Sequence, residues 1–150
     1  MMATKAKIKI KDIVELRKNL DQIYEGKSQI DLSRWALKLS KHIFLLVEFD
    51  YESESVIMDG YNINEKWQNG EIRMHDVRQA GFRVHRLAKE SKDDVLQAAL
   101  RVAGQAIGTG HMREHAMVAS DYAIKVVNLK YADDMEAVKE EREWQIRTMI

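Results

Sequence analysis

Apolar residues recur at three- and four-residue spacing along most of the chain, which is the period of α-helices that bury one face. The first such segment begins at Asp12 and stops near Gly26. A second helix, with Asp31 as its expected N-cap, carries one continuous apolar stripe. The stripe consists of Leu32, Trp35, Ala36, Leu39, Ile43, Leu46 and Val47. We expect this second helix to form part of the core.

Five further helices follow from the same periodicity. Caps at Ser53 or Ser55 and a stop at Gly70 delimit the next one, although Gly60 and the asparagines at 62 and 64 weaken its middle. The others are expected over about 74–90, 95–107 and 113–129, with a last one from 133 or 134 to 149. Short polar turns of this kind join antiparallel neighbours.

The chain contains no proline, which commonly punctuates the loops of folds with strands. We therefore predict an all-α fold: a single bundle or stack of antiparallel αα-hairpins with about six to seven helices. Its 150 residues are the usual size of one domain. We place that domain at 12–150. Residues 1–11, where Ile8 and Ile10 alternate with lysines, are expected to be a flexible or short extended arm.

Charge is balanced over the whole chain, with 24 Lys and Arg against 24 Asp and Glu. A neutral chain lacks the positive field that phosphate-backbone binding uses, so we expect no nucleic-acid partner. The charge is uneven, however: residues 1–20 hold six basic side chains against two acidic, and residues 133–147 hold six acidic against three basic. These ends are either two solvated faces, or they pair with each other or with other chains.

Absent residue types narrow the chemistry. Without cysteine there is no disulfide, no thiolate zinc site and no cysteine nucleophile, and the cytoplasm is the expected compartment. No stretch has the apolar core of a signal peptide or the roughly 20 apolar residues of a membrane span, so no membrane association is expected.

Histidines mark the most distinctive short motif, His111-Met112-Arg113-Glu114-His115. It has the form H-x-x-E-H, in which inverted zinc metalloproteases use two imidazoles as ligands and the carboxylate as general base. Glycines at 108 and 110 suggest instead that a helix ends just before His111. A simpler site for a divalent metal such as zinc, at His111 and His115 with His85, is the milder interpretation. The structural alternative is that these rings cap helix ends or are satisfied in packing.

Small and aromatic residues suggest packing roles. Gly104 and Gly108, four apart on one helix, would create a flat surface where another backbone approaches closely. Ser120-Asp121 lacks the strained turn and oxyanion hole that a serine nucleophile needs. The large aromatic side chains are expected to be core anchors rather than a ligand cage. They are Trp35, Trp67, Tyr122 and Trp144.

The order of several residues resembles the bacterial family of immunity proteins of the immunity-five-like type. The resemblance runs from about Leu32 to Gln145 and is strongest from Ala98 to Val127. It rests on Trp35, Trp67, Gly70-Glu71, Arg78, His85, Ala98 to Ala106, His111, His115-Ala116, Tyr122 to Lys125, Arg142 and Trp144-Gln145. The resemblance implies an all-α antidote to a secreted toxin and recurrent histidines at 85, 111 and 115. It also implies a small residue at the position of Glu114, which makes the H-x-x-E-H match accidental.

Two hypotheses follow for the function. In the first, the domain binds a cognate protein toxin through an exposed helical face, without catalysis and without a cofactor. In the second, the histidines hold a metal or small ligand. The first is favoured, because no nucleophile, base and orienting group come together in the sequence. His85, Glu114, Tyr122 and Trp144 are the candidate functional surface, and an apolar helix face leaves room for a homodimer.

Overall fold

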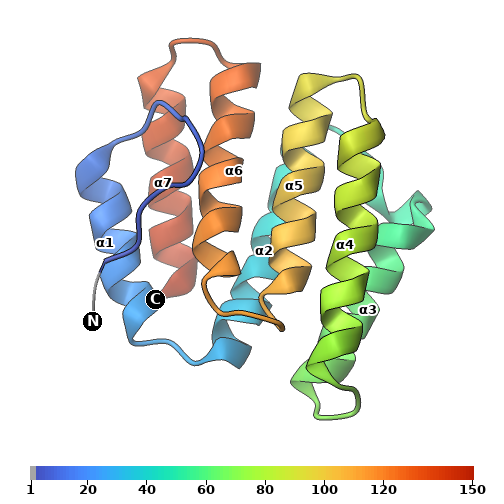
Figure 1. Cartoon of the computed structure of the whole chain (residues 1–150). Helices are drawn as coiled ribbons and strands as arrows, with labels where there is room; N and C mark the ends of the chain where they lie inside the picture. The colour runs from blue at the N-terminus through green and yellow to red at the C-terminus, as the bar shows by residue number, and fades with distance from the viewer. Residues whose placement is uncertain (1–2) are drawn as a thin grey trace.

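The structure, a computed structural model, describes residues 3–150 and is all-helical (Figure 1). Seven α-helices and one 3-10 turn, η1 (Tyr51–Ser53), make up the described chain, and it contains no strand. The helices are α1 (Val14–Glu25), α2 (Gln29–Leu46), α3 (Ser55–Gln68), α4 (Met74–Glu90), α5 (Asp94–Gly108), α6 (His115–Lys130) and α7 (Met135–Met149). The predicted fold class is confirmed.

The helices from α4 onward run up and down as consecutive antiparallel hairpins (Figure 1). In that view α4, α5 and α6 form a row at the front, α2 lies behind α5 and α6, and α3 lies behind α4. Helix α1 packs against α7 beyond α6. Since α5 contacts α2, α3, α4 and α6, it is the central element of the fold.

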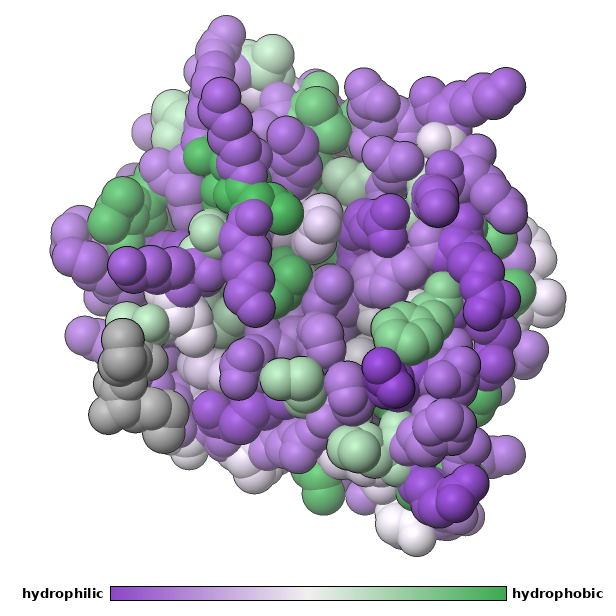
Figure 2. Space-filling view, viewed as in Figure 1, coloured by the Kyte–Doolittle hydropathy of each residue, from purple (hydrophilic) through white to green (hydrophobic). Residues whose placement is uncertain are grey.

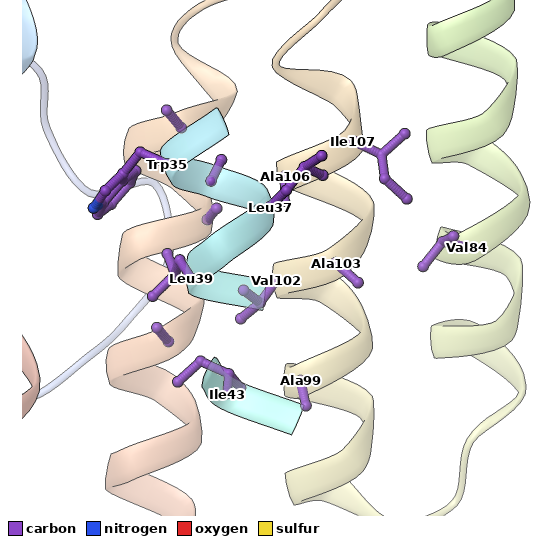
Figure 3. Packing of buried hydrophobic residues seen from close by; sticks show 14 of the residues in the cluster. Trp35, Leu37, Leu39, Ile43, Val84, Ala99, Val102, Ala103, Ala106 and Ile107 are labelled. Carbon is purple, nitrogen blue, oxygen red and sulfur yellow. The ribbon is translucent and has the colours of Figure 1, made fainter. Parts of the chain in front are cut away.

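The core lies where α2 meets α5 and α6. Side chains of α2, including Leu39 and Ile43, face small residues of α5 such as Ala99 and Ala106 (Figure 3). Small residues on α5 let the helix axes approach, and the larger aliphatic groups of α2 fill the space between them. Trp35 is an anchor as predicted: it is 5% exposed, and its indole N–H donates to Thr148 Oγ1 at 3.0 Å.

Two predicted helix starts were wrong. Helix α2 begins one turn earlier than expected, because Ser28 is its N-cap and accepts a hydrogen bond from the Asp31 amide at 3.1 Å. Asp31 instead lies in the first turn, where its negative charge interacts favourably with the positive end of the helix dipole. Helix α3 has Glu54 at its N-cap position without a side-chain hydrogen bond there, so neither serine caps it.

The middle of α3 is continuous despite its unfavourable residues, because tertiary contacts use them. A β-carbon on Gly60 would lie 2.4 Å from the Cδ1 atom of Ile107, so a larger residue there would require the Ile107 side chain of α5 to shift. Asn64 is fully buried: it accepts a hydrogen bond from Ser33 at 2.8 Å and donates one to the Ile107 carbonyl at 2.9 Å.

Residues 3–13 form no helix or strand, and they lie along α1 and α6. Asn128 of α6 holds both backbone groups of Lys11, accepting from its N–H at 2.8 Å and donating to its carbonyl at 3.0 Å. The Thr4 amide donates to the carboxylate of Asp21. We call this segment the N-terminal arm.

A charged cluster lies buried between the arm, α6 and α7. Arg142 is 0% exposed and donates to Asp12 at 2.6 and 2.9 Å and to Asp121 at 2.9 Å. Arg17 reaches the other side of Asp121 with two further bonds of 2.9 Å. Buried charges are tolerated only when paired and hydrogen-bonded, which is the case here. Ser120 accepts from Arg142 at 3.1 Å, so its hydroxyl is part of this cluster.

The oppositely charged ends of the chain do meet. Lys11 pairs with Asp133 at 2.6 Å on the surface, where such contacts contribute little to stability. Inside, the basic end contributes the acid Asp12 and the acidic end contributes Arg142. Within residues 3–150, none of the helices is both long and apolar enough to span a membrane.

Candidate functional site

The connection between α5 and α6, residues 109–114, is bonded to the end of α1 and to the start of α2. The guanidinium of Arg113 lies 4.4 Å from the centre of the Tyr24 ring and donates to the carbonyls of Tyr24 at 2.9 Å and Lys27 at 2.8 Å. Gln29 donates to the Thr109 carbonyl at 2.9 Å. These bonds hold the junction in one conformation and set the position of His115, the first residue of α6.

His85 on α4 and His115 on α6 lie on either side of Gln105 on α5. His115 Nδ1 is 2.6 Å from the Gln105 side-chain oxygen, and His85 Nε2 is 3.4 Å from the Gln105 side-chain nitrogen. Arg101, one turn earlier on α5, lies 3.0 Å from His85 Nδ1. We call these four residues the histidine face, which spans three consecutive helices.

The protonation of the histidine face follows from these contacts. An arginine only donates, so His85 Nδ1 must accept and the ring keeps its proton on Nε2. A rotation of the Gln105 side-chain amide by about 180° would place its oxygen, an acceptor, beside the Nε2 proton of His85. Its nitrogen, a donor, would then face Nδ1 of His115, and no other atom would have to move. Burial, followed by the charges of Arg101 and His115, lowers the pKa of His85 to about 4. Burial and the neighbouring His111 also lower the pKa of His115. Both rings are therefore neutral near pH 7.

Glycines form the floor under the two rings. A β-carbon on Gly104 would lie 2.6 Å from the His85 ring, and one on Gly108 would lie 3.3 Å from the His115 ring. One on Gly81 of α4 would lie 3.2 Å from the Gly104 carbonyl oxygen. The expected close approach at Gly104 and Gly108 is therefore present. The two glycines leave space for the α4 backbone and for both imidazole rings.

The H-x-x-E-H motif does not adopt the geometry of a metalloprotease. His111 precedes α6, which begins at His115, so the two imidazoles are not ligands on one turn of a helix. Their ring centres are 5.8 Å apart. Glu114 is exposed at the N-cap position and makes no capping bond. Within residues 3–150 no three acidic or histidine side chains form a group that could hold a metal, and His85 is engaged by a cation, Arg101.

Tyr122 and Trp144 lie in different places. Tyr122 shares a shallow hollow of about 360 Å³ between α5 and α6 with Arg101 and Lys125, next to the histidine face. Trp144 lies in a groove of about 580 Å³ formed by α2, α6 and α7. Its ring stacks on His42, with centres 3.7 Å apart, and His42 in turn lies 2.7 Å from Glu141. The four candidate residues thus do not form one surface, although His85 and Tyr122 share a side.

Arg101 and Gln105 were not among the predicted site residues, although they connect the histidines. Both lie one or two turns from Gly108 on α5, on the side that faces α4 and α6. Their four-residue spacing was visible in the sequence, but long polar side chains in an alanine-rich helix do not by themselves indicate a partner.

Comparison with known proteins gives the family. The model of the family described as "Imm-5 like putative immunity protein" matches residues 22–150. The chain belongs to this family. The Imm-5 like match covers all of α2 to α7, so it includes the histidine face and its glycine floor. No curated protein and no solved structure matches the chain.

Proposed function

We propose that this chain is a non-catalytic immunity protein that neutralises a protein toxin by direct contact, in the bacterial cytoplasm. Membership of the Imm-5 like family supports a toxin as the partner. The observation that carries a contact mechanism is the histidine face, where polar groups from three helices are held in place by internal bonds.

A fixed polar surface favours tight binding because little side-chain freedom is lost on association. His85 and His115 are partly exposed, so each ring retains a surface for a partner while its other side rests on glycine. Tyr122 and Lys125 extend this surface along α6. Figure 2 shows the front of the molecule as mostly hydrophilic, with hydrophobic groups in separate patches.

Neutralisation by contact requires one immunity protein for each toxin. The test is to titrate this chain into the toxin encoded beside its gene and to follow the residual toxin activity, with size-exclusion chromatography of the mixture. We expect inhibition to be complete at an equimolar ratio and a stable complex to elute. Full protection at a small fraction of the toxin concentration would indicate catalysis and would overturn the proposal.

Metal dependence separates the two hypotheses for the histidines. We expect the same titration in EDTA to give the same end point, because no metal takes part in the contact. Arg101→Ala, which releases His85, should weaken the complex about tenfold, a moderate interface effect. Lys38→Ala, an exposed residue on the opposite layer, is the control. Loss of binding in EDTA would favour a metal site.

A further inference from the structure

The outer side of α4 carries an exposed stripe of basic and aromatic residues. The residues are His75, Arg78, Phe82, Arg86 and Lys89, which we call the α4 stripe. Their spacing of three, four, four and three places them on one side of the helix. All five are exposed, and Phe82 retains 42% of its surface in solvent.

The charges of the α4 stripe have no counter-ions in the described residues. No ion pair or side-chain hydrogen bond within residues 3–150 involves Arg78, Arg86 or Lys89. Residues 73–92 hold six basic against two acidic side chains, in a chain that is neutral overall. By contrast, Arg17 and Arg142 are bonded within the fold. The stripe thus has positive charge available for another molecule.

Phe82 gives the stripe an apolar centre. The guanidinium of Arg78 lies 5.0 Å from the centre of its ring, a cation–π contact that orders both side chains in advance of binding. Arginine and aromatic residues are enriched at the centres of protein interfaces, where a few side chains provide most of the affinity. Lysine-rich solvated faces lack this combination.

We propose that the α4 stripe docks an acidic surface of the toxin partner, with Phe82 inserted at the centre of the contact. This inference rests on the proposed function. It extends the contact from the histidine face, since His85 lies on α4 and is bonded to Arg101. A protein partner fits better than nucleic acid, because the chain has no net positive charge.

The experiment compares two matched pairs of variants in calorimetric titrations against the toxin encoded beside this chain's gene, itself inactivated by substitution. Arg78→Glu/Arg86→Glu is paired with Lys38→Glu/Lys139→Glu, which makes the same charge change at exposed sites of α2 and α7. Phe82→Ala is paired with Leu45→Ala, whose side chain is 72% exposed on α2.

We expect each stripe variant to raise the Kd at least about tenfold, and each control to stay within about twofold of the wild type. Wild-type affinity should fall between about 50 and 300 mM NaCl, because salt screens the exposed charges. Circular dichroism checks the fold, and Arg78→Gln/Arg86→Gln is a milder second pair.

The outcomes distinguish the two proposals. If the wild type does not bind the toxin, the proposed function fails. If the wild type binds and the stripe variants match their controls, the α4 stripe is not the docking site and the proposed function stands. Stripe-dependent binding to a 20-nucleotide DNA, or a stripe-dependent homodimer by size-exclusion chromatography, with toxin affinity unchanged, would also overturn the inference.

Discussion

Gly104 is the residue on which the histidine face depends most directly. The His85 ring occupies the position that a side chain would need, with only 2.6 Å left for a β-carbon. Gly104→Ala should therefore displace the ring and break its contact with Arg101. We expect a loss of about 1–3 kcal/mol in the free energy of unfolding, the usual cost of overpacking, measured by urea denaturation.

Gly26→Ala is the control for this substitution. Its new β-carbon would meet only the Ile23 carbonyl at 3.8 Å, and the backbone there has a φ of −85° that alanine adopts readily. A stability change for Gly104→Ala no larger than that of Gly26→Ala would contradict the packing described for His85.

Arg142 is the largest fully buried side chain of the described residues, and its removal leaves Asp12 without its arginine and Asp121 with Arg17 alone. We expect Arg142→Ala to lower the free energy of unfolding by about 3–5 kcal/mol, as when one member of a buried ion pair is deleted. Arg147→Ala, an exposed position on the same helix, should change it by less than about 0.5 kcal/mol. Equal effects for the two variants in urea denaturation would rule out a structural role for the buried cluster.

The lowered pKa of His85 makes stability depend on pH. Its folded value of about 4 is below the value of 6.5 expected when unfolded, so the unfolded chain binds more protons between these limits. Stability is therefore fully present above pH 6.5 and declines as the pH falls towards 4. His85→Gln should flatten this decline in unfolding experiments at several pH values, whereas His75→Gln, an exposed change on the same helix, should leave it intact.

At the scale of elements, the N-terminal arm is held to α6 largely through Asn128. Asn128→Ala removes both hydrogen bonds to Lys11, so the backbone beside the exposed lysines of the arm can detach and enter the active site of a protease. We expect limited trypsin digestion to remove the arm several times faster in this variant, while cleavage within α1 to α7 stays slow. Cleavage at the wild-type rate would show that the arm is held by other contacts.

The helices could be predicted from the sequence where one stripe of apolar residues decided the outcome. Helix α4 has the predicted bounds because its buried side follows an unbroken period. The start of α2 was misplaced because Ser28 and Asp31 are both good caps, and only the geometry selects the serine. Tertiary contacts also stabilise α3: Gly60 leaves space for a side chain of α5, and Asn64 donates a hydrogen bond to the Ile107 carbonyl of α5.

The candidate site was predictable only in part. His85 and His115 could be named as a candidate group with His111, but the bridge through Gln105 depends on how three helices align. The charged cluster was not predictable at all, because Asp12 and Arg142 are 130 residues apart. Residue pairs at that separation leave no periodic signal in a single sequence.

At the scale of the whole molecule, the chain has no net charge, but its basic and acidic side chains lie in different regions. Residues 1–20 and residues 73–92, which include α4, each hold a basic excess, and six acidic side chains lie in residues 133–147, which include most of α7. Exposed charges act over about one Debye length, near 8 Å at physiological salt, so each region attracts its own class of partner. An approaching acidic protein would be oriented towards α4 and away from α7.

The buried bond between Asp12 and Arg142 joins two parts of the chain that are 130 residues apart and are therefore synthesised at different times. At about 5–20 residues per second, Arg142 is made roughly 6 to 26 s after Asp12. Until then Asp12 and Asp121 lack their central cation, and α1 lacks the helix against which it packs. The domain therefore reaches its final form only after α7 has been synthesised, and a chain truncated before α7 would carry all four residues of the histidine face without a completed fold.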